Sequence, residues 1–345
     1  SPLRAALFDV RARLSGGLSD ALPEPEASLA AGVLLGARAD IPQSLKDDMN
    51  ATGTSHLVAV SGQNVALIAG LLLAVLAWLV GRRPAAWLSL AGIAGYAVLV
   101  GGQPSVLRAA VMGGLYVVAA ALGRQSSGAI GLALAGAAMT ALEPQLARDV
   151  SFQLSFAATL GLITMTPLLR DRIQAALGRW PAAADFPLAR PAVEMLAVTL
   201  AAIAFTLPIT AVNFHRVSLV APLANLFAVP AFLAVALSAA PTAVIAAVFP
   251  AAGHYLAWLA WPAAAYMVAA VRLFAGVPVA SIELRGVGAG HAVAYYALLL
   301  GGLWLLARRP AEAAPAPTVD PKPTRLTALP ASGLALILAL SSLLL

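Results

Sequence analysis

Long apolar segments, separated by short polar loops, follow one another from residue 62 to the end of the chain. They lie near residues 62–80, 85–100, 104–122, 127–142, 150–169, 191–213, 218–238, 251–275, 288–307 and 328–345. Most of them approach the roughly 20 residues that a helix needs to cross the hydrocarbon core of a bilayer. The pattern predicts an all-α fold, a polytopic membrane bundle of about nine to eleven spans.

One of these regions is interrupted by prolines. Pro222, Pro230, Pro241 and Pro250 all fall within residues 218–250. Proline removes a backbone N–H and opposes a regular helix. Broken helices occur at membrane depth where the freed backbone groups are buried in protein or line a wet cavity. The sequence leaves open whether 218–250 is one span, two spans or a re-entrant pair.

The N-terminal part of the chain has a different pattern. Apolar residues recur there at helical spacing, with arginines between them: Leu3, Leu7, Val10 and Leu14. This is typical of an amphipathic helix on a membrane surface, or of a helix that packs on another domain. We therefore divide the chain into four parts. They are an outer interfacial segment (1–52), a polytopic membrane domain (53–309), a Pro- and Ala-rich cytoplasmic linker (310–327) and a final span (328–345).

Composition excludes several classes of protein. Hydrophobic residues make up 61% of the 345 residues and charged residues only 10%, whereas soluble domains carry about 25% charge. The chain has no Cys, which excludes disulfides and thiolate metal sites. Its four His are scattered, and it has no P-loop or Rossmann glycine pattern. We expect a membrane protein without a bound metal or cofactor.

Cations in the loops orient the predicted bundle. Eleven of the 21 Lys and Arg residues fall on alternate loops: Arg82, Arg83, Arg124, Arg170, Arg172, Arg179, Arg190, Arg308, Arg309, Lys322 and Arg325. The intervening loops offer mainly Arg148 and Arg216. The positive-inside rule assigns the cation-rich loops to the cytoplasm. The N-terminal segment is then outside, and the final span runs outward.

A first cluster of polar residues lies between residues 53 and 70. Polar groups in apolar segments are candidates for function, because ordinary spans need none. On a continuous helix, His56, Gln63 and Asn64 share one face. Three interpretations stay open: hydrogen bonding between helices, the lining of a wet pore, and hydrolysis with His56 as base and Ser61 as nucleophile. The last lacks a visible orienting carboxylate and oxyanion hole.

A second cluster, residues 101–114, contains Ser105 and Arg108. Pro104 suits the first turn of a helix, which puts Arg108 about one turn inside. Its side chain either snorkels back to the interface or faces the bundle and meets a carboxylate or a phosphate. The sequence does not decide between these two positions.

A third cluster, residues 143–161, begins another apolar helix. Asp149 suits an N-cap or a partner of the helix dipole. Ser151, Gln153 and Ser155 form polar stripes along the same helix, which indicates contact with other helices or water rather than lipid. A further polar residue, Asn225, lies in the proline-interrupted region.

Taken in order, these motifs resemble those of the ComEC competence family. The motifs are GVLLGARADIP (32–42), SHLVAVSGQNVALIAG (55–70), PSVLRAAVM (104–112), the pair Gly123 and Arg124, DVSFQLSF (149–156) and NLFAVP (225–230). No single motif is decisive, but the series covers most of residues 30–235. Beyond about residue 235 only the hydrophobic pattern is similar.

The resemblance implies an inner-membrane channel that conducts single-stranded DNA into the cytoplasm during natural transformation. It implies as partners single-stranded DNA, the lipid bilayer, a DNA receptor and a cytoplasmic helicase or ATPase, with the oligomeric state open. Many family members also carry an OB-like domain and a C-terminal metallo-β-lactamase-like nuclease domain. This chain has no OB-like strand series and no His-rich metal motif. We therefore expect no nuclease activity from it, and expect a shorter family member or part of a longer protein.

Eleven residues are candidates to line or brace the DNA path: His56, Ser61, Gln63, Asn64, Ser105, Arg108, Asp149, Ser151, Gln153, Ser155 and Asn225. Among them, Arg108 is expected to contact phosphate, or to pair with Asp149 and join two spans. With only 6% aromatic residues, the sequence predicts a weakly binding pore, which suits conduction. Two alternatives stay open: a secondary transporter of a small solute, and an intramembrane serine hydrolase.

Overall fold

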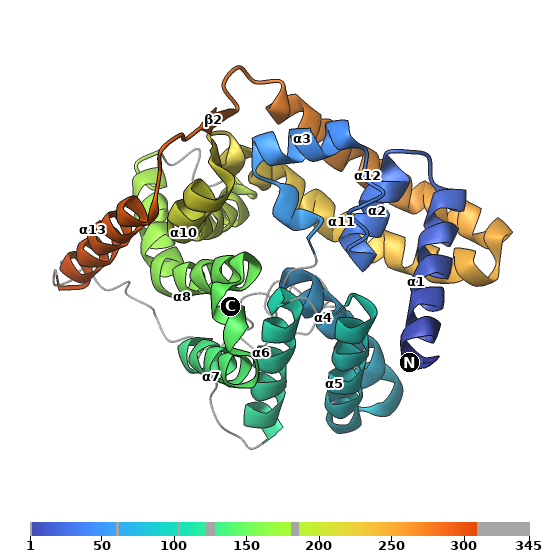
Figure 1. The fold of residues 1–345 in the computed structure, drawn as a ribbon. Coiled ribbons are helices and arrows are strands. Elements are labelled where there is room, and N and C mark those ends of the chain that lie inside the picture. The colour runs from blue at the N-terminus through green and yellow to red at the C-terminus, as the bar shows by residue number, and fades with distance from the viewer. Residues whose placement is uncertain (1, 60–61, 102–103, 122–127, 181–185, 309–345) are drawn as a thin grey trace, which may run out of the picture.

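The computed structural model describes residues 2–59, 62–101, 104–121, 128–180 and 186–308 (Figure 1). This part of the chain forms twelve α-helices, two short 3₁₀ helices and two short strands. In order they are α1 (Pro2–Ala21), α2 (Glu26–Leu35), α3 (Gln43–Thr52), η1 (Ser55–Leu57), α4 (Gly62–Val80), α5 (Arg82–Leu99), α6 (Pro104–Ala121), α7 (Gly128–Leu142), η2 (Pro144–Arg148), α8 (Val150–Leu177), α10 (Ala189–Phe214), β1 (Arg216–Ser218), α11 (Ala221–Val248), α12 (Pro250–Ala275), β2 (Ser281–Glu283) and α13 (Ala289–Arg308). The all-helical fold class predicted by the apolar segments is confirmed.

Each predicted span up to residue 307 coincides with a helix. Among the described residues, four helices are long and apolar enough to cross a membrane: α8, α10, α11 and α12. Shorter apolar helices cover Glu26–Leu35, Trp87–Leu99, Gly128–Leu142 and Ala289–Leu305. The chain is a multi-pass membrane protein by these helices, and the total of about nine to eleven spans stays a prediction. The linker (310–327) and the final span (328–345) lie outside the described residues.

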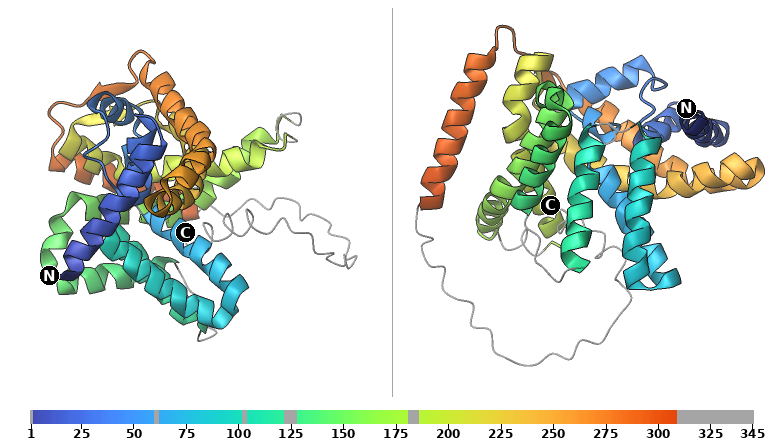
Figure 2. Two further views of the ribbon diagram at one scale, coloured as in Figure 1. Left: turned by 90° about the vertical axis from the view of Figure 1, so that its right-hand side faces the viewer. Right: turned by 60° about the horizontal axis from the view of Figure 1, so that its bottom comes forward.

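The proline-interrupted region does not contain the broken helix that the sequence allowed. α11 runs without a break from Ala221 to Val248, and α12 starts at Pro250. Pro222 lies in the first turn, where the missing N–H costs nothing. The two internal prolines are tolerated because α11 packs on α12, α1 and α2 along a face of buried small residues. The resulting α11–α12 hairpin runs at a steep angle to the upright α5 and α6 (Figure 2, right).

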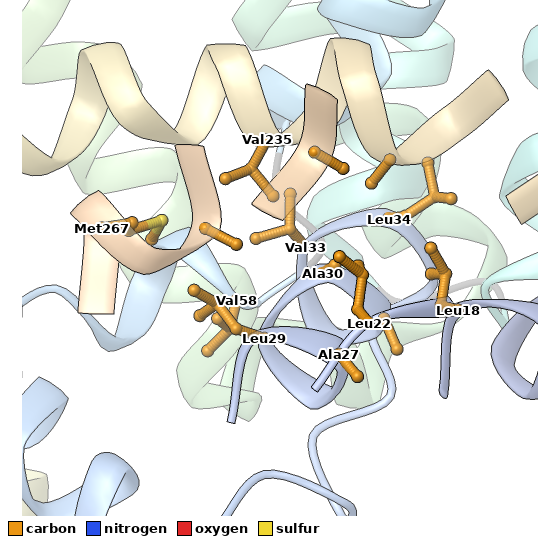
Figure 3. Close-up of a cluster of buried hydrophobic side chains, with 14 of the residues drawn as sticks. Leu18, Leu22, Ala27, Leu29, Ala30, Val33, Leu34, Val58, Val235 and Met267 are labelled. Atoms are coloured by element: carbon orange, nitrogen blue, oxygen red, sulfur yellow. The ribbon is translucent and has the colours of Figure 1, made fainter. Parts of the chain in front are cut away.

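α1 and α2 belong to the same apolar core as this hairpin. Leu18 of α1 and Leu29 of α2 are almost fully buried, and they share a cluster with Val235 of α11 and Met267 of α12 (Figure 3). Gly17 approaches α11 so closely that an added Cβ would lie 3.0 Å from the backbone nitrogen of Ala247. The N-terminal segment therefore helps to build the helical core. Its location on a membrane surface stays a prediction.

Two neighbouring tyrosines fix α13 to α10. Pro208 inside α10 has no N–H to offer the carbonyl of Ala204, four residues earlier. The Tyr295 hydroxyl donates to that carbonyl at 3.0 Å, and the Tyr296 hydroxyl donates to the next one, of Phe205, at 2.7 Å. The two tyrosines thus satisfy backbone carbonyl oxygens one turn before Pro208, and the same hydrogen bonds hold α13 against α10.

α8 and α10 form a second closely packed pair. An added Cβ on Gly161 of α8 would lie 2.6 Å from the carbonyl oxygen of Ala201 and 2.8 Å from the Phe205 ring. Beyond α10, β1 pairs with β2 in antiparallel register, with Arg216 opposite Glu283 and Val217 opposite Ile282. This short ribbon holds the connections before α11 and after α12 together.

Candidate functional site

Arg108 of α6 is a buried cation at the contact between α6 and α8. Only 9% of the residue is exposed. Its Nε donates to the Ser155 hydroxyl at 2.7 Å, and Nη1 lies 3.3 Å from Met112 Sδ. Its guanidinium carbon lies 6.0 Å from the centre of the Phe156 ring. The side chain therefore faces the bundle and does not snorkel back to the interface.

No carboxylate of the described chain neutralises Arg108. The ion pairs found there are Arg170–Asp171, Arg216–Glu283 and Arg285–Glu283. The suggested pair between Arg108 and Asp149 does not form, because the Asp149 carboxylate accepts a hydrogen bond from the Phe152 N–H at 2.8 Å and caps α8. The charge of Arg108 is held by a hydroxyl, a thioether and an aromatic ring.

The Phe156 ring is held from two sides. Phe152 stacks on it with ring centres 4.3 Å apart. On α7, Gly136 leaves room for it, since an added Cβ there would lie 3.0 Å from Phe156 Cε1. The ring that faces Arg108 is therefore in a fixed position.

Three other candidates of these two clusters are placed differently from Ser155. Ser105 is buried one turn earlier on α6. Ser151 is exposed, and the Gln153 amide donates to the carbonyl of Ala147, before the helix begins, at 2.9 Å. Of the polar stripes on α8, only Ser155 reaches the cation.

A second group of residues meets near the start of α11, and we call it the α11 junction. Gly53 ends α3 with a φ of 70°, and an added Cβ there would lie 2.9 Å from the Ala221 Cβ. Arg38 Nε donates to the carbonyl of Val58 at 3.4 Å, and Val58 shares a buried cluster with Ala228. Motif 32–42 therefore contacts motif 55–70, and both contribute residues to the buried cluster that also contains Ala228 of motif 225–230.

Asn225 and His56 lie in the segments that form this junction. Asn225 is only 5% exposed, and its Oδ1 has no hydrogen-bond partner among the described residues. His56 is exposed at one side, and its Nδ1 lies 3.0 Å from the Gly53 carbonyl oxygen. Desolvation by the surrounding chain lowers the pKa of His56, so the ring is neutral at pH 7. Nδ1 then donates to the carbonyl and Nε2 is an acceptor.

The one-face arrangement of the first polar cluster is not formed. His56 lies in η1, whereas α4 begins at Gly62. The side chains of Gln63 and Asn64 lie outside the described residues, as does all of Ser61. A serine hydrolase would orient its His with a carboxylate, but Nδ1 of His56 meets a backbone carbonyl instead.

Comparison with known families decides the assignment. Residues 33–309, which include both groups of polar residues, match the family described as Competence protein. The chain belongs to the competence protein family. The matched region, residues 33–309, is a competence domain. Among the described residues no group of three or more His, Cys, Asp or Glu could hold a metal ion.

Two curated proteins are similar to this competence family member. ComE operon protein 3 of Bacillus subtilis (strain 168) is 25% identical over 225 residues, which are 65% of this chain and 27% of that protein. Uncharacterized protein YcaI of Escherichia coli (strain K12) is 30% identical over 233 residues, which are 64% of this chain and 29% of that protein. The chain thus spans less than a third of either relative. No solved structure matches it.

Sequence reasoning on this competence protein missed several residues of the two groups, among them Phe156, Met112, Arg38 and Gly136. Met112 could have been found, because it follows Arg108 by four residues and neighbours it on the helix. Arg38 stands inside a recognised motif and could also have been singled out. Gly136 gives no signal, because its role depends on the packing of α7 against α8.

Proposed function

We propose that this chain forms a passage for single-stranded DNA through the bacterial cytoplasmic membrane, into the cytoplasm, during natural transformation. Membership of the competence protein family supports this role. The observation that carries it is Arg108, a guanidinium buried between α6 and α8 without a carboxylate among the described residues.

The setting of Arg108 suits a passing phosphate. Burying a cation without a counter-charge is costly, and ionisable groups at membrane depth are candidates for function. The Ser155 hydroxyl and the Phe156 ring offset only part of that cost. A DNA phosphate supplies the missing negative charge, and a guanidinium can bind phosphate through two parallel hydrogen bonds.

Weak binding at this point is compatible with transport. Where the structure describes side chains, Arg108 is the one charged residue that is buried. Tight single-strand binding grooves combine many cations with stacking aromatics, and a single cation cannot hold a strand in that way. A strand therefore moves on after each contact, as conduction requires.

This role needs partners that supply DNA and free energy. The sequence has no P-loop, so an ATPase or helicase on the cytoplasmic side would drive transport, and a receptor outside would deliver DNA. Both partners are part of the proposal. The orientation of the chain in the membrane, with Ser155 toward the outer face, is part of it as well.

The test is import of labelled DNA by cells that carry the full-length gene, wild type against Arg108→Ala. Membrane levels are matched by immunoblot, and Arg285→Ala, at a cation that is exposed and paired, is the control. We expect Arg108→Ala to reduce import at least about tenfold, because one charge-assisted contact is worth roughly 1.5–3 kcal/mol, while the control imports normally. Equal import by Arg108→Ala and wild type would refute the phosphate contact.

A further inference from the structure

The end of α8 and the start of α10 form an exposed, basic hairpin end, which we call the α8–α10 tip (described residues 170–180 and 186–190). In Figure 2 (left) it is the light green ribbon that projects away from the rest of the described chain. Trp180 is 72% exposed and Phe186 is 58% exposed. Arg172, Arg179 and Arg190 are exposed as well. Aromatic and cationic side chains are thus displayed together.

The length of α8 predicts that the tip lies outside the lipid layer. The apolar part of α8 runs from residue 150 to 169 and measures about 30 Å, the thickness of the hydrocarbon core. Residues 170–177 add about 12 Å of helix, whereas a headgroup layer is roughly 5–7 Å thick. Asp149 at the other end prevents α8 from sliding inward, because its carboxylate would enter hydrocarbon. Trp180 follows this extension, so we expect it in water and not in an interfacial aromatic belt.

The charges of the tip are available to a ligand. Across residues 170–190 the sequence has four Arg against two Asp. Arg170 is paired with Asp171 at 3.1 Å. Arg172, Arg179 and Arg190 have no carboxylate within ion-pair distance among the described residues. Three exposed guanidinium groups and an exposed indole on one hairpin end have the composition of a single-strand binding surface, where cations contact phosphates and aromatic rings stack on bases.

We propose that the α8–α10 tip binds single-stranded DNA as the strand leaves the membrane, with Trp180 stacked on a base and Arg172, Arg179 and Arg190 on phosphates. This inference rests on the proposed function, since that function brings a strand to this face. An anionic lipid surface is the weaker candidate, because the tip extends past the headgroups. Here an exposed tryptophan has no lipid to contact, whereas it fits a nucleobase.

The test is binding of fluorescent oligo-dT to the full-length protein in phosphatidylcholine nanodiscs, measured by anisotropy at several salt concentrations. We expect Trp180→Ala to weaken binding about tenfold, within the range for loss of one stacked base. The double variant Arg172→Ala/Arg179→Ala should reduce the slope of log K against log salt by about 1.4, since each phosphate contact contributes about 0.7. The matched controls are Trp258→Ala, at a 70% exposed tryptophan of α12, and Arg285→Ala, and both should bind like wild type.

Three results would overturn the proposal. They are no binding by the wild type, equal affinity of tip variants and wild type, and equal loss in the controls. Repeating the measurement with phosphatidylglycerol nanodiscs tests the lipid alternative. If the tip variants differ from wild type only there, the tip binds anionic lipid and the proposal is wrong.

The outcome is separable from that of the proposed function. If tip variants bind DNA normally while Arg108→Ala blocks import, the tip proposal fails and the passage stands. If Arg108→Ala imports normally while Trp180→Ala binds more weakly in nanodiscs, the phosphate contact at Arg108 fails and the tip remains a DNA surface.

Discussion

The two ends of α8 hold arginines in opposite surroundings. Near its N-terminal end, Arg108 of the neighbouring α6 reaches Ser155 in a buried contact. Beyond its C-terminal end, Arg179 lies exposed next to Trp180. About 33 Å of helix separates Ser155 from Leu177. An arginine side chain therefore meets a low dielectric at one end of α8 and water at the other. This difference determines how large an effect the substitution of a single arginine has.

A buried charge acts singly, whereas exposed charges act as a group. In a low dielectric the field of Arg108 is weakly screened, and removing or pairing it changes the local free energy by several kcal/mol. At the tip, water and salt screen each arginine, and an exposed ion pair is worth about 0–1 kcal/mol. Single substitutions should therefore matter at the buried end, and combined substitutions at the exposed end.

The largest effect is expected when the buried end receives its missing carboxylate. In Ser155→Asp, a carboxylate replaces the hydroxyl that lies 2.7 Å from Arg108 Nε. The two side chains should form a buried ion pair, which leaves the guanidinium neutralised and unavailable to phosphate. We expect import to fall at least about tenfold, as for Arg108→Ala, with unfolding temperature equal to or above that of wild type.

The matched control for this variant is Ser151→Asp. Ser151 lies one turn earlier on α8 and is exposed, so the same new charge does not reach Arg108. Import by the control should stay well above that of Ser155→Asp, because the charge of Arg108 remains free. If Ser155→Asp imports DNA at the wild-type rate while the protein is folded, the free charge of Arg108 has no part in transport.

A smaller effect is expected in the middle of α8, which connects the two ends. In Gly161→Ala the new Cβ would overlap the Ala201 carbonyl oxygen, 2.6 Å away, so α8 and α10 must separate. We expect the free energy of unfolding to fall by about 1–3 kcal/mol, with both import and oligo-dT binding reduced.

Gly113→Ala on α6 is the comparison for that substitution, because no atom of the described residues lies within 4 Å of an added Cβ there. It should stabilise the protein by about 0.5–1 kcal/mol, since Ala loses less backbone entropy in a helix than Gly. Denaturant unfolding in detergent measures both changes. Equal changes in the two variants would mean that the α8–α10 contact does not limit stability.

The sequence predicts more of the helices than of the contacts between them. Apolar length alone locates α4, whose bounds, Gly62–Val80, coincide with the predicted span. The unbroken α11 could not be predicted, because local proline chemistry opposes it and only packing on α1, α2 and α12 compensates. Likewise, Asp149 has two possible partners in the sequence, a backbone N–H and Arg108. The nearer backbone group binds it, since capping needs no tertiary contact.

The next smaller effect concerns the tyrosines that fix α13 to α10. Tyr296→Phe removes the hydroxyl that donates to the Phe205 carbonyl at 2.7 Å. Phe205 is also the residue whose ring packs against Gly161. We expect a loss of about 0.6–1.5 kcal/mol in unfolding free energy, and a larger loss in the double variant Tyr295→Phe/Tyr296→Phe. Oligo-dT binding at the tip should not change, which distinguishes this variant from Gly161→Ala. Unaltered stability of the double variant would contradict the role given to Pro208.

The smallest effect concerns pH and should appear only at the α11 junction. Desolvation lowers the pKa of His56 below its ordinary value of 6.5, so the folded state binds a proton less readily than the unfolded state. Stability should therefore fall as the pH drops below about 6.5, and solvent at the exposed side of the ring keeps the loss small. Unfolding temperatures between pH 7.5 and 5 should decrease less in His56→Gln than in wild type. The tip variant Arg179→Ala should keep the wild-type slope, because arginine stays charged over this range. Parallel curves for His56→Gln and wild type would show that the junction does not desolvate this ring.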